Sequence, residues 1–362
     1  MKILALDIGT GTQDILLFDS GKTIENCVKM VMPSPTVIAA GRIRAATAAG
    51  KNLVLTGVNM GGGPVTDALR SHLHAGLAAY ATPEAAETFD DDLRVVQQMG
   101  VVLADEEELQ CIEAAHMVEL KDLDLSMVRR ALAAFDVSPD WDALAVAVFD
   151  HGKAPPGYSD RKFRFEHLRR QSREGEASIA DLGYLRPEIP SYMTRMLAVA
   201  RTAGEDVPLL VMDSAEATIL GELEDRHVRR HHCKVLVNLG NEHTLAFHLH
   251  GTTIRGVFEH HTHLLASDRL EDYILRLVSG DLDGDGVWRD QGHGAIAFSR
   301  CEKADLLAVT GPLRRRLEGS SLSPYFAAPH GDMMLAGAFG LVRAWARKQE
   351  SWREEIDAAL GS

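Results

Sequence analysis

Cysteine is scarce in this sequence, and no two cysteines have the short spacing that a metal site requires. Cys27, Cys111, Cys233 and Cys301 are the only ones among 362 residues. Their separation excludes a Cys-only zinc site and an iron–sulfur loop. Isolated cysteines are typical of a reducing compartment, so we expect four buried, reduced thiols in a cytoplasmic protein.

The sequence also lacks an excess of basic residues and any long apolar run. Lys and Arg number 38 against 52 Asp and Glu, which gives a net charge of −14. A nucleic-acid-binding protein needs a basic face for its phosphate contacts, so we expect no nucleic-acid partner. No run of about 18 apolar residues is present, and Asp7 interrupts the first apolar stretch too early for a signal peptide. We therefore expect no membrane partner.

What the sequence does have is an alternation of apolar strands and helices, which is typical of an α/β protein. Residues 3–6, 14–19 and 23–32 read as three strands joined by tight turns, which form a meander. After a helix at 36–49, strands and helices alternate, and this pattern predicts a mostly parallel sheet covered by helices. Between 152 and 178, two prolines, three glycines and several basic residues interrupt the pattern and predict a loop or lid.

The second half of the chain restarts with the pattern of the first half. Residues 234–239, 244–249 and 252–258 form a second unit of strand, glycine turn, strand, turn and strand. The two units share little sequence identity, so what they have in common is the order of strands and turns. This echo is the most informative feature of the organisation of the chain.

A glycine-rich segment, Gly9-Thr10-Gly11-Thr12-Gln13, follows the first strand. A dinucleotide-binding fold or a P-loop needs its glycines to lead into a helix, because the helix N-terminus binds the phosphates. Here the glycines lead into residues 15–18, a short apolar run that reads as a strand. The segment is therefore predicted to be the tip of a β-hairpin, where backbone N–H groups and threonine hydroxyls can hold phosphate.

Five segments in order resemble the motifs of the actin/Hsp70/sugar-kinase ATPase superfamily, and the resemblance spans residues 1–344. They correspond to a first phosphate hairpin, a first connecting helix, a second phosphate hairpin, an adenosine motif and a second connecting helix, at 3–12, 211–221, 236–241, 306–312 and 331–340. The resemblance implies an α/β fold with two actin-like (ribonuclease H-like) lobes, each with a mixed sheet that a β-meander opens. It places one lobe at 1–222, completed by a C-terminal helix at 338–362, and the other lobe at 223–337.

The resemblance further implies that ATP and Mg²⁺ bind between the lobes. Asp7 and Asn238 would hold Mg²⁺ through water, and the catalytic candidates that the resemblance implies are Asp7, Glu216 and Asp213. Asp150 and His151 are further catalytic candidates because they follow a predicted strand. The nucleotide would contact glycines and polar residues of the three binding motifs, which are Gly9, Thr10, Gly11, Thr12, Gln13, Asn238, Gly240, Asn241, Gly311 and Pro312. Asn238 departs from the aspartate that is usual at this position. The missing carboxylate weakens the metal site.

Two further segments, Gly61-Gly62-Gly63 and Asp150-His151, each follow a predicted strand. The C-terminal strand ends of a parallel sheet line its ligand crevice, so both segments are expected to face the cleft that holds Asp7. The residues around them also resemble a bacterial and archaeal family that is sometimes labelled pyruvate formate-lyase-activating enzyme. The chain lacks the three close cysteines that such radical chemistry requires.

The function expected from these features is ATP hydrolysis, or phosphoryl transfer from ATP to a small molecule or a protein partner. One alternative is a metal-dependent hydrolase, since Glu259, His261 and His263 would share one strand face and His293 lies further along the chain. Another alternative is a nucleotide sensor or scaffold without catalysis, which Asn238 favours. The sequence predicts neither the substrate nor the oligomeric state.

Overall fold

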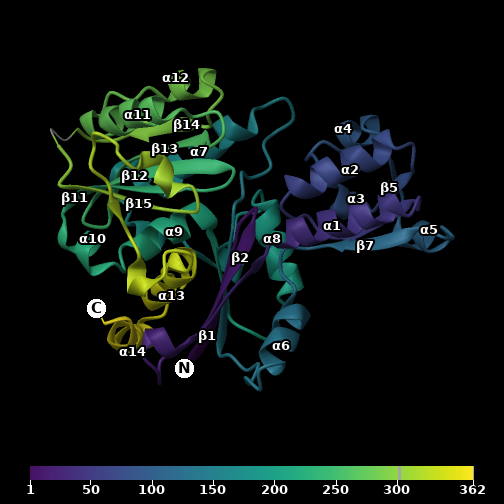
Figure 1. The fold of residues 1–362 in the computed structure, drawn as a ribbon, viewed down its shortest axis with the longest axis horizontal. Coiled ribbons are helices and arrows are strands. Elements are labelled where there is room, and N and C mark those ends of the chain that lie inside the picture. Colours follow the sequence, from purple (N-terminus) through teal and green to yellow (C-terminus); the bar gives the residue numbers. More distant parts are fainter. Residues whose placement is uncertain (301–302, 362) are drawn as a thin grey trace.

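The computed structural model describes residues 1–300 and 303–361, which form three β-sheets with helices around them (Figure 1). One six-stranded sheet comes from the first half of the chain and another from the second half, and a four-stranded sheet is inserted into the first half. Figure 1 shows the four-stranded sheet on one side of the molecule and the second six-stranded sheet on the other, with β1 and β2 between them.

The first sheet has the strand order β3-β2-β1-β8-β10-β9. β1, β2 and β3 form an antiparallel meander, and β8 and β10 continue the sheet parallel to β1. β8 is buried along its whole length, because elements pack on both of its faces. The strands are β1 Lys2–Ile8, β2 Thr12–Asp19, β3 Val28–Pro33, β8 Ala143–Val148, β9 Tyr184–Leu185 and β10 Leu209–Asp213.

The second sheet has the order β14-β13-β12-β11-β15-β16 and repeats this arrangement. β11, β12 and β13 form an antiparallel meander, and β15 and β16 continue parallel to β11. Each sheet therefore contains three meandering strands followed by two parallel ones, which confirms the ribonuclease H-like topology expected for both halves. The strands are β11 Cys233–Leu239, β12 His243–His250, β13 Thr253–His261, β14 Gly294–Ala297, β15 Leu306–Thr310 and β16 Tyr325–Phe326.

Two helices from distant parts of the chain, α9 (Ser214–Glu222) and α13 (Ala336–Lys348), pack against each other and against β1. A Cβ atom at Gly221 would lie 1.7 Å from a backbone oxygen of α13, and one at Gly340 would lie 1.9 Å from a backbone oxygen of α9. Only glycine fits at either crossing point. The small residues of the two segments that resemble connecting helices therefore allow the close approach expected of them.

Residues 35–120 form a unit of their own between β3 and β8. Its four strands are all parallel, in the order β6-β5-β4-β7, and its buried apolar side chains form a core separate from those of the larger sheets. The alternating pattern in the sequence predicts parallel strands here, but not their separation into another sheet. The elements are α1 Pro35–Ala48, β4 Leu53–Gly57, α2 Pro64–His74, β5 Ala79–Ala81, α3 Pro83–Ala86, α4 Leu93–Gln98, β6 Val101–Leu103, α5 Glu106–Gln110 and β7 His116–Leu120.

The segment 152–178, predicted to be a loop or lid, contains helix α7 (Asp160–Gln171). The prediction is wrong because one face of this basic segment is buried, including Arg164, Phe165 and Leu168. Arg164 is buried because it forms ion pairs with two carboxylates. Composition alone did not reveal that one of the basic residues belongs to the core.

The C-terminal segment at 338–362, predicted to be one helix, is divided between α13 and α14, and Gln349 separates them. The remaining helices are α6 Leu125–Ala133, α8 Thr194–Thr202, α10 Arg226–Arg230, α11 Ser267–Ser279, α12 Gly284–Arg289 and α14 Glu350–Leu360. Among the described residues, no helix combines the length and the apolar character needed to cross a bilayer.

The cysteines agree only in part with the expectation of buried thiols. Cys27 and Cys233 are buried, whereas Cys111 is exposed just after α5. Cys301 lies outside the described residues.

Candidate functional site

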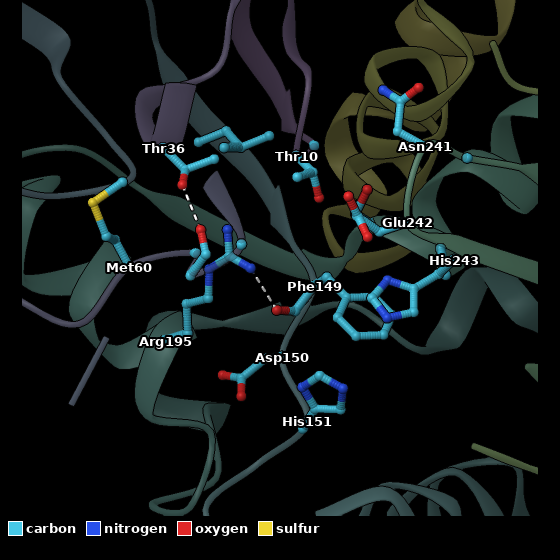
Figure 2. Close-up of a pocket in the computed structure, with 18 of the residues that line it drawn as sticks. Thr10, Thr36, Met60, Phe149, Asp150, His151, Arg195, Asn241, Glu242 and His243 are labelled. Atoms are coloured by element: carbon cyan, nitrogen blue, oxygen red, sulfur yellow. Dashed lines mark hydrogen bonds between the residues drawn. The ribbon is translucent and has the colours of Figure 1, made fainter. Parts of the chain in front are cut away.

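A cavity of about 500 Å³ opens where elements of the three sheets meet (Figure 2). Its walls come from the tips of the β1–β2 and β11–β12 hairpins, from the loops after β4 and β8, and from the first residues of α8 and α9. Asp7, the three glycines at 61–63 and Asp150-His151 all line it. The structure therefore brings together segments that are up to 144 residues apart in the sequence (151 − 7).

The two hairpin tips that face this cavity have the same backbone hydrogen bond. The N–H of Gly9 donates to the carbonyl oxygen of Thr12 at 2.9 Å, and the N–H of Gly240 donates to that of His243 at 3.0 Å. The tips also lie in contact, since a Cβ atom at Gly11 would lie 2.5 Å from the nearest side-chain atom of the second tip. Figure 2 shows residues of both tips at the cavity. The two turns are structural counterparts that bound one space.

Asp7 lines the cavity where α9 and α13 approach β1. Its carboxylate accepts hydrogen bonds from the hydroxyl groups of Ser214 at 2.6 Å and Thr218 at 3.4 Å. A Cβ atom at Gly337 would lie 1.9 Å from Oδ2 of Asp7, so this position also requires glycine. Burial raises the pKa of Asp7 to about 6, although the two hydroxyl groups oppose the shift.

Asp14 also lines the cavity, and it is a residue that the sequence reasoning missed. It is the direct partner of Asp7 in the antiparallel register of β1 and β2. Burial, together with the charge of Asp7, raises the pKa of Asp14 to about 8. The signal for this residue was present, because a hairpin closed between Gly9 and Thr12 pairs residue 7 with residue 14.

Asn238 occupies in the second hairpin the position that Asp7 has in the first, and it lines the cavity. Its Nδ2 donates a hydrogen bond to the hydroxyl of Thr310 at 3.4 Å. Leu245 is its partner across β11 and β12, as Asp14 is for Asp7. The first hairpin thus offers two carboxylates, and the second offers a single amide at the equivalent place.

Most of the other predicted nucleotide contacts line the cavity, namely Gly9, Thr10, Gly11, Thr12, Gly240, Asn241 and Pro312. Gln13 and Gly311 do not belong to this lining. Gln13 donates from Nε2 to the carbonyl oxygen of Pro33 at 3.0 Å. Gly311 has φ = +93°, and a Cβ atom there would lie 2.4 Å from the carbonyl oxygen of Leu239, so this glycine permits packing against the second hairpin.

The glycines at 61–63 bring the loop after β4 close to α8 and to the first hairpin tip. A Cβ atom at Gly61 would lie 2.6 Å from Nη2 of Arg195, and one at Gly63 would lie 3.4 Å from Cγ2 of Thr10. Arg195, which the sequence reasoning also missed, lies on the cavity wall and donates to the carbonyl oxygen of Phe149 at 2.7 Å (Figure 2). It also donates to both carboxylate oxygens of Asp122 at 2.6 and 3.0 Å. Its charge is balanced within the wall.

Asp150 and His151 line the cavity, but the carboxylate of Asp150 is already engaged. It accepts hydrogen bonds from the backbone N–H groups of Gly152 at 2.8 Å and Met196 at 3.0 Å. The bond from Met196 ties the loop after β8 to the start of α8, although burial still raises the pKa of Asp150. Burial, and secondarily His293, lowers the pKa of His151 well below its usual value.

Asp213 and Glu216, both predicted to be catalytic, are buried outside the cavity lining. Asp213 forms an ion pair with Arg164 at 2.9 Å. Burial, and then the charge of Asp213, raises the pKa of Glu216 well above its usual value. Ser214 and Thr218 are one helical turn apart and face the cavity, whereas residue 216 lies on another face of α9.

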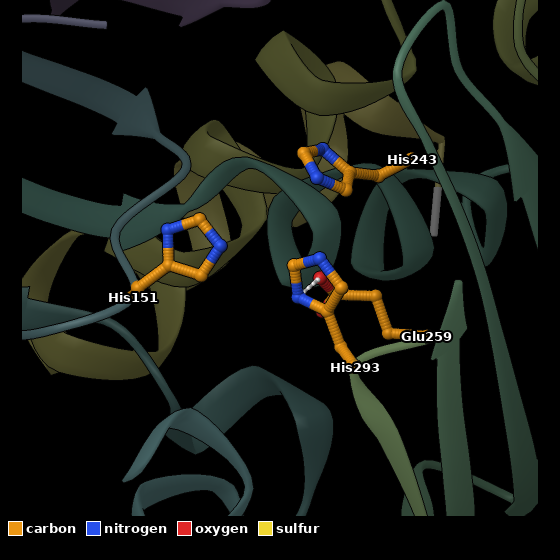
Figure 3. A group of neighbouring side chains, drawn as sticks. All are labelled: His151, His243, Glu259 and His293. Carbon is orange, nitrogen blue, oxygen red and sulfur yellow. Dashed lines mark ion pairs between the residues drawn. The ribbon is translucent and has the colours of Figure 1, made fainter. Parts of the chain in front are cut away.

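A group of histidines and one glutamate lies at the side of the cavity next to the second sheet (Figure 3). The members are His151, His243, Glu259 and His293. Each offers one nitrogen or oxygen atom, and these four atoms all lie within 4.8 Å of one another. Of the four residues predicted as alternative metal ligands, Glu259 and His293 belong to this group. His261 lies beside it, with its ring centroid 4.7 Å from that of His293, and His263 is exposed.

Charged neighbours keep the acid of this group ionised, and burial lowers the pKa values of His151 and His243. Burial alone would raise the pKa of Glu259, but Arg164 and His293 hold it well below its usual range. Burial lowers the pKa of His243 to about 3 and that of His261 to about 4. Near pH 7 the neutral rings therefore have a nitrogen lone pair available.

The cavity wall is otherwise rich in carboxylates, which are Asp7, Asp14, Glu87, Asp90, Asp91, Asp150 and Glu242. Burial raises the pKa of Asp91 to about 6. Lys153 offsets one of these charges through an ion pair with Glu87 at 2.7 Å. An anionic ligand would need cations to accompany it into this space, since like charges repel strongly where water is scarce.

A comparison with protein-family models identifies the family of the chain. Residues 60–316, well over half of the sequence, match the family described as "Putative pyruvate format-lyase activating enzyme (DUF1786)". The chain belongs to this family. No curated protein matches the chain.

Three solved structures are among those similar to this DUF1786 protein. The ROK hexokinase from Thermus thermophilus is 13% identical with a TM-score of 0.31, and the match covers 97% of this chain and 100% of the hexokinase. The ethanolamine utilization protein EutJ from Carboxydothermus hydrogenoformans is 10% identical with a TM-score of 0.32, and the match covers 94% of this chain and 89% of EutJ. The apo psk41 ParM protein is 11% identical with a TM-score of 0.34, and the match covers 98% of this chain and 99% of ParM.

A meander followed by parallel strands occurs in both six-stranded sheets, and the glycine-containing helices α9 and α13 cross each other closely. This DUF1786 protein therefore has the two-lobed actin-like ATPase fold that the sequence motifs implied.

Proposed function

We propose that this protein binds ATP with Mg²⁺ in the cavity and hydrolyses it or transfers its terminal phosphoryl group. The observation that carries the proposal is the pair of facing hairpin tips, each closed by the same hydrogen bond at Gly9 and Gly240. Turns of this kind can bind phosphate oxygens through backbone N–H groups without a helix N-terminus. Two tips in contact can hold a chain of phosphates from opposite sides.

The oxygen donors between the tips fit Mg²⁺. Asp7, Asp14 and Asn238 offer carboxylate and amide oxygens, which a hard dication prefers. Asp7 already accepts hydrogen bonds from Ser214 and Thr218, so we assign it to the water shell of the ion. A bound Mg²⁺ would supply charge neutralisation for the phosphates, and the acidic wall makes that neutralisation necessary.

Catalysis would consist mainly of positioning, because most predicted bases are occupied or remote. Asp213 and Glu216 lie outside the lining, and Asp150 accepts two backbone hydrogen bonds. Glu242, at the second tip, lines the cavity, and we assign it to orienting an attacking water or hydroxyl group. This carboxylate is the member of the second tip that could offset the absence of an acid at Asn238.

The acceptor would contact the wall that lies away from the hairpin tips. That wall contains Met60 and the carboxylates of Glu87, Asp90 and Asp91. Its polarity suits a small hydroxylated or cationic molecule, or a segment of a protein partner. The activity suggested by the family name gains no support from the sequence, because the four cysteines are too far apart to hold an iron–sulfur cluster.

Thermal denaturation with and without nucleotide tests the proposal. ATP with Mg²⁺ should raise the Tm of the wild-type protein, and Mg²⁺ alone or ATP with a chelator should raise it less. Asp7→Asn should abolish the response to ATP with Mg²⁺, whereas the exposed-site control Asp136→Asn should retain it. Wild-type affinity in Asp7→Asn would overturn the assignment of this carboxylate.

A phosphate-release assay separates the enzyme from a binding protein. Release of phosphate that depends on Mg²⁺ and on Asp7 would support catalysis. A nucleotide-dependent rise in Tm without phosphate release, with or without candidate acceptors, would identify a nucleotide sensor instead. No response to any nucleoside triphosphate would overturn the proposal as a whole.

A further inference from the structure

The side chains of His151, His243, Glu259 and His293 converge from four separate segments (Figure 3). His243 begins β12, Glu259 lies near the end of β13 and His293 precedes β14, so these three come from neighbouring strands of the second sheet. The backbone N–H of His293 donates to the carbonyl oxygen of Glu259 at 2.9 Å, which fixes the two residues side by side. His151 reaches the group from the loop after β8 in the first sheet.

The buried members of this group lack the hydrogen bonds that buried polar atoms normally make. His293 is 2% exposed and Glu259 is 0% exposed. Within the described part of the chain, both ring nitrogens of His293 and Oε1 of Glu259 have no hydrogen-bond partner of adequate geometry. Nδ1 of His293 nevertheless lies only 2.6 Å from Oε1 of Glu259. This contact is an ion pair when the ring is protonated, and it leaves Nε2 of His293 as a buried ring nitrogen without a partner, which a bound ion would satisfy.

We propose that His151, His243, Glu259 and His293 bind a divalent first-row transition-metal ion. Three imidazole nitrogens and one carboxylate oxygen form a borderline ligand set that suits Zn²⁺ or Fe²⁺, whereas Mg²⁺ and Ca²⁺ prefer oxygen ligands. The site is therefore chemically distinct from the oxygen-only set around Asp7. It also differs from the set predicted from sequence, because His151 and His243 replace His261 and His263.

The surroundings of the four ligands support a built site. Arg164 donates to Oε2 of Glu259 at 2.7 Å, and Oε1 is the carboxylate oxygen on the side of His293. The ring of Phe149 stacks on that of His243, with 4.4 Å between centroids and 8° between planes, and fixes its orientation. Such outer contacts hold metal ligands in position and tune the metal in known sites.

The location of the site gives the ion access to the cavity and a link between the two halves. His151 and His243 line the cavity, whereas Glu259 and His293 lie behind them. The ion would therefore lie at the wall of the cavity, held by two ligands that line the cavity and two that do not. Because one ligand comes from the first sheet and three come from the second, metal binding would also fasten the two halves together.

Metal analysis of the full-length protein tests the site. The protein is purified without chelators from medium supplied with zinc, iron and manganese, and its metal content is measured by mass spectrometry. We expect about one equivalent of a transition-metal ion per chain at this site. His293→Ala and His151→Ala should each remove it, and His151→Ala provides a second variant at a less buried position in the other half of the molecule.

Two controls assign the bound metal to these residues. His263→Ala changes an exposed histidine close to the site and should leave the metal content unchanged. Cys233, His248 and His250 form another group with metal-ligand spacing in the second sheet, so Cys233→Ala measures any metal held there. With Co²⁺ in place of the native ion, the visible absorption of the site should persist in Cys233→Ala and disappear in His293→Ala, without a thiolate charge-transfer band.

Each outcome of the metal analysis either supports the proposed site or overturns it. Loss of about one equivalent in both His151→Ala and His293→Ala, with folded protein by circular dichroism and unchanged content in His263→Ala, would support the site. Absence of any transition-metal ion in wild-type protein after incubation with Zn²⁺ and with Fe²⁺ under anaerobic conditions would overturn it. Metal that is lost only in Cys233→Ala would overturn it as well. None of these outcomes depends on nucleotide binding.

Discussion

Asp7 and Asp14 face each other across the β1–β2 pair, and both carboxylates are largely buried at the cavity. Burial raises both pKa values, to about 6 for Asp7 and to about 8 for Asp14, and Asp7 adds to the shift of Asp14. Without a cation, the pair therefore holds at least one proton near pH 7. A cation placed between the hairpins would displace that proton.

The first prediction concerns the pH dependence of stability in a chelator, where no cation compensates the pair. An acid whose pKa is raised by folding binds its proton more tightly in the folded chain, so protonation stabilises the fold. For Asp14 this contribution is complete below its unfolded pKa of 3.8 and is lost as pH rises through about 8. Each pKa unit corresponds to about 1.4 kcal/mol. Asp14→Asn should therefore flatten the decline of Tm between pH 5 and 9.

The exposed substitution Asp136→Asn is the matched control, and its pH profile should follow the wild type. Addition of Mg²⁺ should raise the Tm of the wild type more at pH 8 than at pH 5. Parallel wild-type and Asp14→Asn profiles across this range would contradict the assigned burial of the Asp14 charge.

The second prediction concerns the amide at the second hairpin. Asn238→Asp supplies a carboxylate at the position equivalent to Asp7, at the cost of the hydrogen bond from Nδ2 to Thr310. We expect tighter binding of ATP with Mg²⁺ and faster phosphate release, because a second acid strengthens an oxygen-ligand site. Calorimetry and phosphate release measure both effects. The exposed change Asn26→Asp should alter neither, and weaker binding in folded Asn238→Asp would contradict the placement of the ion.

The third prediction concerns the crossing of α9 and α13. Gly340→Ala would place a Cβ atom 1.9 Å from a backbone oxygen of α9, so the helices must separate. We expect a loss of about 1–3 kcal/mol in the free energy of unfolding, as for other overpacked sites. Gly41→Ala, in the exposed middle of α1 with no atom within 4 Å of the new Cβ, should instead stabilise by about 0.5–1 kcal/mol. Denaturant titration measures the free energy of unfolding of both variants. If Gly340→Ala were as stable as Gly41→Ala, the close crossing of the helices would be refuted.

The fourth prediction concerns the buried arginine of α7. Arg164 pairs with Asp213 at 2.9 Å and with Glu259 at 2.7 Å, and all three side chains are almost fully buried. Arg164→Met removes the guanidinium that balances the charge of two buried carboxylates, and we expect a loss of about 3–5 kcal/mol of stability. Arg169→Met, on the exposed face of the same helix, should change stability by less than about 1 kcal/mol. Similar small effects for both variants would show that the carboxylates find other partners.

Much of the fold could be predicted because local patterns coincide with tertiary structure. The glycines at Gly9 and Gly240 precede apolar strands in both halves, and this indicated two hairpins with the same connectivity. The separate sheet at 35–120 could not be predicted, because parallel strands look alike whether they join one sheet or two. Helix α7 was missed because an arginine-rich segment reads as solvated unless its buried partners, such as Glu259, are known.

Site residues could be predicted where they lie at the end of a strand. They could not be predicted where their place depends on the direction in which a helix face or a side chain points. Asp7 and the hairpin glycines reached the cavity because the first strand ends there. Glu216 did not, since the face that α9 turns to the cavity is set by packing against α13. His151 and His243 join one group with His293 only because two separate sheets meet, and no spacing in the sequence encodes that meeting.

The unit at 35–120 has a core of its own, yet its loops form one wall of the cavity, with Met60 and Asp91 facing the same space as the hairpin tips. Substitutions in that unit can reshape the wall without disturbing the strand pairs that hold Asp7 and Asn238. Under the proposed function, the residues that contact the acceptor and those that hold the nucleotide would lie in parts of the chain that can diverge independently. Descendants of one ancestral protein could exchange what they recognise while keeping the two hairpins unchanged.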